Sequence, residues 1–495
     1  MIILSTMVIS KAVPTQNSEC RRNSRISFAF GVLSRDKPQT NILTARGYNL
    51  FVHLLTQRSM TARDGGGSMM VRRMLRSLIQ KLSHDAPTTL RVEFSDGSVY
   101  QSRAGSKADI LIRFRSSSAE WRSLLFFYEG VLECYVNEEV DIEGDHPINA
   151  LATIGHKGGY TPASFWLRMA QNPLNAVLQW LQEWRQDNGD RDRAIRNAEF
   201  HYGAPPALFE HMLGETVGYS EGLWVSGTET LNQAKFNSYE YIARKLRLQP
   251  GLKVLEVGAG WGYMPIYLTK RYGAEVTVYN PVTRQNDYMR ARFERHGVGD
   301  RISLVEGDLR DIAKEARTFD RFLSIGVHEH AGYPLKQYRL WADSIAAALK
   351  EDGIGVVSTT TRMLRQMTNR LTLKYIFPGG HLPSLPDTLT AFDRAGLTLV
   401  EVENLWPHYE RTMRTWRDNF AVHWPEIQKS DPTFFTERFR RTWSMYLDAS
   451  CDSFRDGLDL SHIVFTKGRN AVSFPPVDLT AGNFIGGDTQ PECYR

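Results

Sequence analysis

One stretch constrains the fold of this chain more than any other: "KVLEVGAGWGYMPIYLTKRYG", residues 253–273. An apolar run is followed by a glycine-rich turn and a helical pattern, which predicts a strand, a loop and a helix. Gly258, Gly260 and Gly262 permit unusual backbone angles and the close approach of a ligand. Amide groups at the start of the helix can hold a carboxylate or phosphate. The stretch predicts a cofactor loop, but this glycine pattern alone does not identify the cofactor.

Three further strand patterns extend the prediction to a whole sheet: "AEVTVYNP" (274–281), "ISLVEGDLRDI" (302–312) and "FDRFLSIGVHEHAG" (319–332). Strands alternate with helices to about residue 467, which predicts an open α/β sheet that binds ligands at the carboxyl ends of its strands. A strand, GxG loop and helix followed by "EGD" are typical of class I S-adenosylmethionine methyltransferases. The predicted fold class is therefore α/β, with a doubly wound, Rossmann-like methyltransferase sheet and a smaller N-terminal α+β domain.

Polar residues at the predicted strand ends are candidate cofactor contacts. Glu256 lies beside the glycine loop, Asn280 ends the second strand and Asp308 follows the third. An NAD enzyme would carry a carboxylate at the position of Asn280 to hold the ribose, so the sequence argues against NAD.

The composition is that of an ordinary globular protein. The chain has 495 residues, 42% of them apolar and 23% charged, with a net charge of +5. This mild basic excess suits an anionic membrane surface or a phosphate-bearing partner and is too weak to predict nucleic-acid binding. Four scattered cysteines form no CxxC pair, which favours a reduced cytosolic setting. No apolar run is long enough to predict a membrane-spanning helix.

The pattern divides the chain into five predicted segments. Residues 1–69 form a disordered extension or follow from an early start codon; 70–160 form the N-terminal domain, 161–195 a helical linker, 196–467 the catalytic domain and 468–495 a flexible tail. In the N-terminal domain, "SDGS" predicts a hairpin, "ADILIRFRS" a strand, and residues 121–145 a helix followed by a turn. Within the linker, the charged run "RQDNGDRDR" (185–193) is predicted to be solvated.

Two predicted helices have more than one interpretation. The helix at about 69–82 places Val71, Met74 and Leu75 on an apolar face, so it either packs on its own domain or lies on a membrane surface. The stretch 163–184 carries Trp166, Trp180 and Trp184, which suit core or interdomain packing and are also compatible with membrane contact.

Several motifs, in order and spacing, resemble the cyclopropane-fatty-acyl-phospholipid synthases and mycolic acid cyclopropane synthases. They are "HYGAPPALF" (201–209), "YSEGLW" (219–224), "LNQAK" (231–235), the glycine loop, "VHEHAG" (327–332), "KYIFPGGHLPS" (374–384), "HYERTMRTW" (408–416) and "MYLDASCDSFR" (445–455). The resemblance implies transfer of a methyl carbon from S-adenosylmethionine to the cis double bond of a phospholipid acyl chain. Loss of a proton from the new methyl group then closes a cyclopropane. It also implies a cytoplasmic enzyme peripherally associated with the inner face of the membrane, and a homodimer.

The resemblance assigns roles by position. Tyr219 and Ser220 would contact the methionine end of the cofactor, Gln285 the ribose, and Asp308 with Leu309 the adenine. The loop that would cradle the cofactor consists of Gly258, Ala259, Gly260, Trp261 and Gly262. Glu329 and Tyr409 match an active-site glutamate and tyrosine.

The sequence departs from the family at two positions around the proton acceptor. Typical members bind a bicarbonate ion among a cysteine, a histidine, the glutamate and the tyrosine; here Glu221 replaces the cysteine and Ser358 the histidine. A like-charge contact at about 4 Å costs on the order of 4 kcal/mol at an effective dielectric near 20. We therefore expect no bicarbonate, with Glu221 as general base and its pKa coupled to that of Glu329. Alternatively, Glu221 is a wall residue paired with an arginine such as Arg362.

Because the base would lie at a different position from the bicarbonate ion, it could remove a different proton. The product is then either a cyclopropane or a methyl-branched or methylene-bearing chain. Two other classes of function also stay open: a small-molecule N- or C-methyltransferase, and a non-catalytic cofactor- or lipid-binding protein. "HEH" (328–330) predicts no metal site, since alternate residues of an extended stretch point to opposite sides. Trp406, Trp416 and Trp443 are predicted to line the acyl channel or the core.

Overall fold

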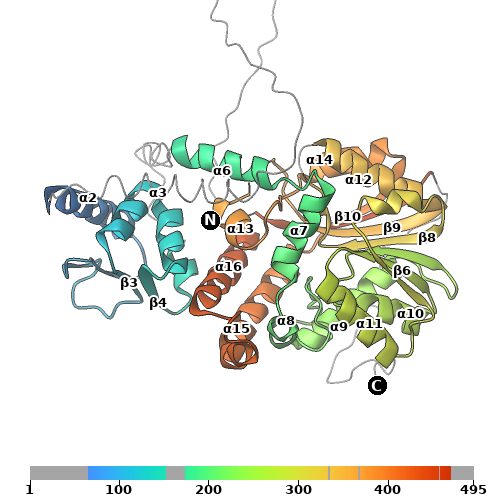
Figure 1. Ribbon diagram of the computed structural model, residues 1–495, viewed down its shortest axis with the longest axis horizontal. Helices are drawn as coiled ribbons and strands as arrows, with labels where there is room; N and C mark the ends of the chain where they lie inside the picture. Colours follow the sequence, from blue (N-terminus) through green and yellow to red (C-terminus); the bar gives the residue numbers. More distant parts are fainter. Residues whose placement is uncertain (1–64, 152–172, 333–334, 366–367, 456, 470–495) are drawn as a thin grey trace, which may run out of the picture.

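The computed structural model describes residues 65–151, 173–332, 335–365, 368–455 and 457–469, and these form two packed domains (Figure 1). Most of the predicted N-terminal extension and C-terminal tail lies outside these ranges, as does Trp166. The first helix, α2 (Gly65–Ser83), begins before the boundary expected at residue 69. Among the described residues, no helix is both long and apolar enough to span a bilayer.

The N-terminal domain is a four-stranded sheet with the strand order β2-β1-β3-β4, packed against helices. Its elements besides α2 are β1 (Leu90–Glu93), β2 (Val99–Gln101), β3 (Ile110–Phe114), α3 (Ser117–Val136) and β4 (Val140–Gly144). The hairpin predicted at "SDGS" joins β1 and β2, with Gly97 at a φ of +83° in the turn. The turn predicted after α3 is confirmed at Asn137 and Glu138, but the strand that follows it was not predicted. "VDIEG" forms β4, because Val140 and Ile142 alternate into the core and pair with β3.

Helix α2 packs on its own domain. Val71 and Leu75 are buried, and Arg72 forms ion pairs with Asp96 at 2.6 Å and Glu120 at 3.2 Å. Met74, which was expected on the same face, is half exposed together with its neighbours Met69 and Met70. Contact of this helix with a membrane stays a prediction.

The catalytic domain is built on a seven-stranded sheet with the strand order β10-β11-β9-β8-β5-β6-β7, which confirms the predicted fold class. The strands are β5 (Lys253–Val257), β6 (Glu275–Asn280), β7 (Ile302–Glu306), β8 (Phe319–Ile325), β9 (Leu349–Thr361), β10 (Leu397–Asn404) and β11 (Asp459–Lys467). Strand β11 runs antiparallel between β9 and β10, whereas β5 to β9 pair in parallel. The chain reverses its strand order at β5, which places a ligand crevice between β5 and β8.

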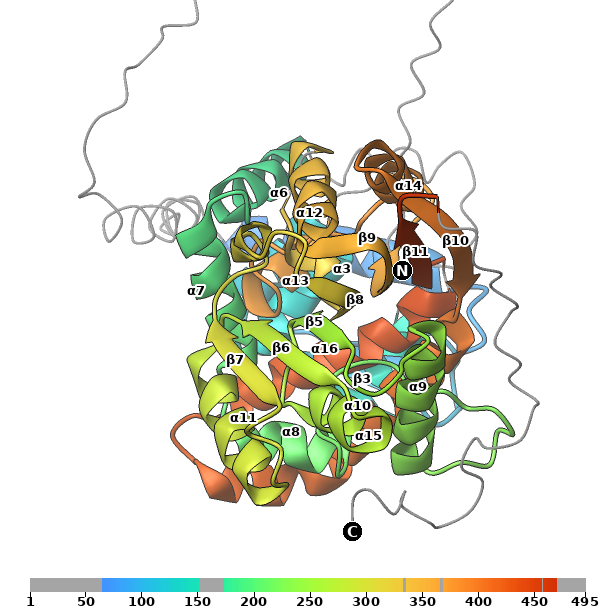
Figure 2. The same ribbon diagram turned by 90° about the vertical axis from the view of Figure 1, so that its right-hand side faces the viewer.

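Helices cover both faces of this sheet (Figure 2). The helices of this part of the chain are α6 (Pro173–Gln186), α7 (Arg191–Tyr202), α8 (Pro206–Leu213), α9 (Leu231–Lys245), α10 (Tyr263–Tyr272), α11 (Thr283–Arg295), η1 (Asp311–Lys314), η2 (His328–His330), α12 (Leu335–Ala348), α13 (Arg370–Tyr375), α14 (Leu385–Arg394), α15 (Trp406–Ser430) and α16 (Glu437–Arg455). Consecutive strand residues enter opposite cores: Val254 packs with α9, α10 and α11, and Leu255 packs with α12 and α14.

The charged run 185–193 is solvated only in part: Arg185 and residues 190–192 are exposed, but the run also makes contacts that fix it. Asn188 is buried, the Asp190 carboxylate caps α7, and Arg191 pairs with Asp311 at 2.7 Å. Helix α7 also crosses the boundary expected at 195/196. The charge of Arg191 is matched by a partner 120 residues away in the sequence, which local composition cannot reveal.

Helix α16 joins the two domains. The Arg441 guanidinium donates to the carbonyls of Tyr135 (3.2 Å) and Val140 (3.0 Å) and pairs with Asp141 at 2.8 Å. The backbone amide of Ile148 donates to Asp448 at 3.0 Å. Because these partners are buried polar groups, the two domains are held in one arrangement.

Replacing Arg441 with Ala is expected to loosen this joint. Two buried carbonyls lose their donor, at a cost of about 1–3 kcal/mol each. Hydrogen exchange should accelerate in residues 135–150 while the seven-stranded sheet keeps its protection. The control is Arg438→Ala, on the exposed face of the same helix. Equal exchange in the two variants would contradict this account of the joint.

Candidate active site

A cavity opens where β5, β6 and β7 end, at the predicted crevice. All of the residues predicted to contact the cofactor line it except Gly262. Gly262 instead forms the N-terminal cap of α10, at a φ of +83° and packed against Met289. The cavity walls also include Ala194, Ala198 and Tyr202 of α7, so the cofactor-binding unit begins before the predicted catalytic domain.

The glycine loop needs its glycines for two physical reasons. Gly258, Gly260 and Gly262 all have φ between +58° and +83°, a region that side chains disfavour. At Gly258, a Cβ atom would also lie 2.3 Å from Cγ2 of Val327. The loop therefore holds its shape only with glycine at this position.

Glu256 gives the cavity a carboxylate without a protein partner. The side chain is buried, and its Oε2 has no hydrogen-bond partner among the described residues. Burial raises the pKa of Glu256 to about 8. A buried carboxyl group of this kind suits a ligand that carries positive charge, as S-adenosylmethionine does in its ammonium and sulfonium groups.

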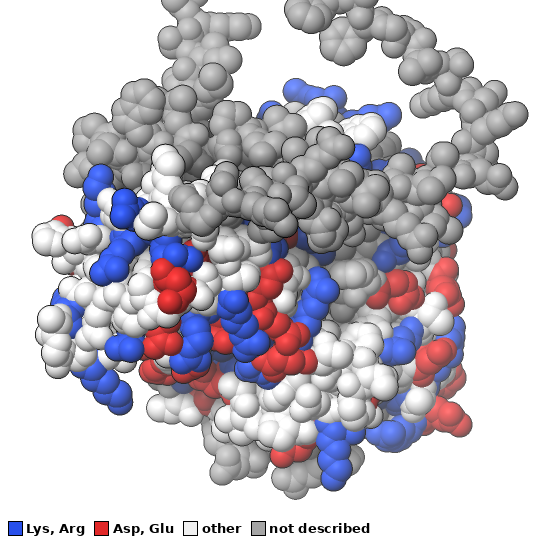
Figure 3. All heavy atoms as spheres, turned by 60° about the vertical axis from the view of Figure 1, so that its left-hand side comes forward, with Lys and Arg blue, Asp and Glu red and all other residues white. Residues whose placement is uncertain are grey.

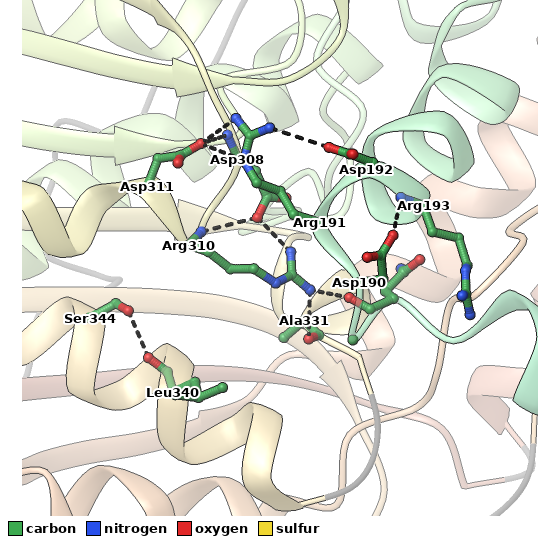
Figure 4. A network of polar contacts seen from close by, with 12 residues as sticks. Asp190, Arg191, Asp192, Arg193, Asp308, Arg310, Asp311, Ala331, Leu340 and Ser344 are labelled. Carbon is green, nitrogen blue, oxygen red and sulfur yellow. Dashed lines mark hydrogen bonds and ion pairs between the residues drawn. The ribbon is translucent and has the colours of Figure 1, made fainter. Parts of the chain in front are cut away.

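The ends of β6 and β7 are held by local polar contacts. The Asn280 amide donates to Asn286 Oδ1 at 2.9 Å and to Gln285 Oε1 at 3.3 Å, which fixes Gln285 against the cavity. After β7, Arg310 contacts Asp308 and also the carbonyls of Asn188 and Ala331 (Figure 4). Arg310 thus ties the loop that would receive the adenine to the segment before α7.

A second cavity adjoins the first. The two share Tyr202, Tyr219, Gly326 and His330. The Tyr202 hydroxyl lies 3.0 Å from Nε2 of His330, and the Tyr219 hydroxyl lies 3.0 Å from that of Tyr446. These side chains therefore form the junction through which a group held in the first cavity would reach a substrate in the second.

Glu329 and Tyr409, the predicted catalytic pair, both line the second cavity. Glu329 Oε1 accepts the amide of Thr360 at 2.6 Å, while Oε2 has no partner among the described residues. Burial raises the pKa of Glu329, and the Thr360 amide opposes that shift. Glu329 therefore has an oxygen available to the cavity and a basicity above that of an ordinary carboxylate.

Residues 328–330 form a turn of 3₁₀ helix, η2, rather than the expected extended stretch. The three side chains still diverge: His328 bonds Thr388, Glu329 bonds Thr360, and His330 bonds Tyr202. Among the residues described, no group of His, Cys, Asp or Glu has the arrangement of a metal site.

Glu221 is buried and lies behind the second cavity without lining it. Its Oε1 lies 2.8 Å from Nε2 of His462 and accepts the Ser358 hydroxyl at 3.3 Å. Burial raises the pKa of Glu221, but the hydrogen bond and charge of His462, together with the charge of Lys235, outweigh it and hold this pKa below its ordinary value. The coupling expected with Glu329 is replaced by pairing with His462, and the partner is not Arg362.

Comparison with known proteins identifies the family of the chain. A family described as mycolic acid cyclopropane synthetase matches residues 189–463. The chain belongs to this family. It is an S-adenosylmethionine-dependent methyltransferase.

Individual relatives share the same core. The chain is 31% identical over 310 residues to a probable fatty acid methyltransferase of Mycobacterium tuberculosis, covering 61% of this chain and 69% of the relative. It is 29% identical over 270 residues to the cyclopropane-fatty-acyl-phospholipid synthase of Escherichia coli K12, covering 54% and 67%. The solved cyclopropane synthase MmaA2 of M. tuberculosis has a TM-score of 0.51 at 22% identity, covers 55% of this chain and 98% of that one, and supports the fold.

His462 is the residue that the sequence reasoning missed. The family's histidine position holds Ser358, but in the β9–β11 ladder His462 stands directly opposite Ser358. Cross-strand neighbours lie on the same face of a sheet. His462 on β11 therefore places a histidine next to the position that Ser358 occupies on β9. Tyr202 was also missed, although "HYGAPPALF" contains it.

Lys235, in the "LNQAK" motif, positions the segment that carries Glu221. Its fully buried ammonium donates to the carbonyls of Ser220 and Glu221 and to the Ser220 hydroxyl, at 2.7–3.0 Å. Burial lowers the pKa of Lys235 to about 7, against the attraction of Glu221. Trp416 and Trp443 belong to the core beneath this segment, with Trp406 packed against that core, so none of the three lines either cavity.

A first prediction concerns the glycine loop. Gly258→Ala should abolish measurable binding of S-adenosylmethionine in calorimetry, because the added methyl group meets Val327 and distorts the loop. The matched control is Gly251→Ala. Gly251 has a φ of +81° but open space around its Cβ position, so this variant carries only the backbone cost of about 1–2 kcal/mol. Equal cofactor affinities in the two variants would refute the crowding argument.

A second prediction concerns the Glu221–His462 pair. His462→Ala leaves a buried carboxylate without its nearest partner and should lower the free energy of unfolding by about 3–5 kcal/mol at neutral pH. Because the pKa of folded Glu221 is lowered, the pairing stabilises the protein above the ordinary carboxyl pKa. The difference from wild type should therefore shrink as the pH falls through the pKa of Glu221.

Urea unfolding across this pH range is the measurement. His462→Gln, which keeps a hydrogen-bond donor, should lose less stability than His462→Ala. A loss in His462→Ala that does not depend on pH would show that packing, and not charge, explains it.

Proposed function

We propose that the protein adds a one-carbon unit to the double bond of an unsaturated fatty acyl chain carried by a phospholipid. The observation that carries this proposal is the junction of the two cavities. The glycine loop and Glu256 stand on one side and Glu329 and Tyr409 on the other, with Tyr202 and Tyr219 between them. Relatives named for fatty acid methylation and cyclopropane formation support the acyl substrate.

In this proposal the first cavity holds S-adenosylmethionine through the glycine loop, Glu256, Gln285 and Asp308. Bound there, it supplies an electrophilic methyl group, whose transfer to a double bond leaves a carbocation on the chain. The aromatic faces of Tyr202 and Tyr219 at the junction stabilise positive charge. Since Glu221 is held as a buried anion by His462, its charge contributes further stabilisation.

The carbocation must lose a proton, and we propose that Glu329 accepts this proton. Glu329 lines the cavity that would receive the acyl chain, and its Oε2 has no partner among the described residues. Its pKa is also raised, which makes it a better proton acceptor. When the proton leaves the new methyl group, the C–H electron pair forms the third bond of a cyclopropane. When it leaves a neighbouring chain carbon, that pair forms a double bond and the chain keeps a branch.

The sequence favoured Glu221 as the base, and that assignment stays an untested alternative. Glu221 would have to act across the wall of the cavity, because it does not line it. We further propose that no bicarbonate takes part. Glu221 and Glu329 are two carboxylates at this site, and each would repel another anion. His462 offsets the charge of Glu221, although Arg362 also lines the second cavity.

Substitution of each glutamate distinguishes the two assignments. Glu329→Gln should lower turnover about 10²- to 10⁴-fold, as expected for loss of a general base. Glu221→Gln and Glu221→Cys should lower turnover by a smaller factor, because they remove only a stabilising charge. The assay contains purified enzyme, S-adenosylmethionine and dioleoylphosphatidylglycerol in detergent. Undiminished turnover in Glu329→Gln, with loss in Glu221→Gln, would return the role of base to Glu221.

The product needs a separate readout, since a cyclopropane and an unsaturated methyl-branched or methylene chain have the same mass. Catalytic hydrogenation before mass spectrometry adds two hydrogens to the alkenes and spares the ring under mild conditions. We expect a product that resists hydrogenation. A wild-type enzyme that modifies no phospholipid acyl chain would overturn the proposed function.

A further inference from the structure

A third cavity continues the path from the cofactor to the surface. It shares Thr368, Gly380, His381 and Leu382 with the second cavity, which in turn meets the first at Tyr202 and Tyr219. His381 is among the shared residues, and neither of its ring nitrogens has a partner among the described residues. The three cavities therefore adjoin one another in series, and of their described lining residues only those of the third include residues of α6.

The mouth of the third cavity carries two large exposed aromatic side chains. Trp180 and Trp184 both line it, and they are 58% and 67% exposed. They stand one turn apart on α6, on the same side of the helix. Packing into a core, one of the roles predicted for them, does not account for this exposure.

Other residues of α6 anchor the helix to the segment that begins α13. Gln179 donates to the carbonyl of Thr368 at 2.6 Å, and the Thr368 amide donates to Glu183 at 3.0 Å. Gln182 reaches the carbonyl of Arg370 at 3.5 Å. These bonds fix the orientation of the helix, so the two tryptophans are held outward at the mouth.

More apolar surface adjoins the mouth after β9. Met363 and Leu364 are 59% and 62% exposed, and the next residue, Arg365, lines the third cavity. The charge of Arg365 is matched by Asp387, at 2.7 Å. Single exposed apolar residues are ordinary, but two tryptophans at one cavity mouth, with Met363 and Leu364 directly before the lining residue Arg365 in the sequence, mark a contact surface.

We propose that the portal surface, formed by Trp180, Trp184, Met363 and Leu364, docks on a lipid bilayer and admits one acyl chain into the third cavity. This inference rests on the proposed function and adds to it the place where the lipid enters. Tryptophan suits such a boundary because its ring is apolar and its N–H can remain hydrated.

A bilayer fits this surface better than an acidic carrier protein that presents an acyl chain. A carrier of that kind would need unmatched cations at the mouth, whereas Arg365 is paired and the same wall contains Glu183 and Asp187. On the face of the N-terminal domain that Figure 3 presents, basic and acidic side chains are interspersed, so no broad basic platform is visible there. Apolar contact at the mouth is left as the main attraction.

The test is co-sedimentation of the full chain with vesicles of dioleoylphosphatidylglycerol. The variant Trp180→Ala/Trp184→Ala should bind about tenfold more weakly or worse, because each ring removes a large apolar area from the contact. Phe200→Ala is the matched control, since Phe200 is an exposed aromatic residue on α7 that lines none of the three cavities. It should bind vesicles like wild type. Unchanged affinity for S-adenosylmethionine in all variants verifies that each is folded.

A competing surface lies on α2, where Met70 and Met74 are exposed. If Met70→Ser/Met74→Ser loses vesicle binding while the tryptophan variant keeps it, the portal proposal is overturned. It is equally overturned if wild type binds no vesicles but modifies a chain delivered on a carrier protein.

Wild-type turnover of the same lipid in detergent tests the proposed function separately. If that turnover is absent while the tryptophan variant still loses vesicle binding, the docking surface stands and the assigned chemistry fails.

Discussion

The arrangement of the active site depends on a buried carboxylate that must be matched. Glu221 has almost no exposure, and an isolated carboxylate there would cost several kcal/mol. Strand β11 brings His462 and β9 brings Ser358 to the carboxylate itself. Helix α9 brings Lys235, whose ammonium donates to the backbone carbonyl of Glu221 and places positive charge nearby. The antiparallel insertion of β11 beside β9 is what places His462 and Ser358 side by side. The electrostatics of the site thus depend on the topology of the sheet.

The same sheet separates two tasks. At the ends of β5, β6 and β7, backbone geometry dominates, because a glycine loop and polar strand ends form the first cavity. Beyond Tyr202 and Tyr219, side-chain basicity dominates, with Glu329 raised in pKa and Glu221 lowered. Two carboxylates in neighbouring environments therefore acquire different roles, one able to accept a proton and the other kept as an anion.

The sequence predicted the parts of the fold that local chemistry determines. The glycine loop, the parallel strands after it and the hairpin at Gly97 follow from periodicity and from turn residues. The family motifs also located Glu329 and Tyr409. Local chemistry could not predict His462, because it lies 241 residues from Glu221 and meets it only through strand pairing. The charged run around Asn188 failed for the same reason, since its partners lie near residue 310. The strand "VDIEG" was missed because its alternation of apolar and polar residues extends over only five residues.

We propose that a carboxylate of the chain, Glu221 paired with His462, replaces a bound inorganic anion as the source of negative charge at the reaction centre. The most direct measurement is turnover of phospholipid in buffer depleted of carbon dioxide, followed by titration with bicarbonate. The account predicts full activity without bicarbonate and no increase on its addition. Activity that is lost on depletion and recovers in proportion to added bicarbonate would contradict it.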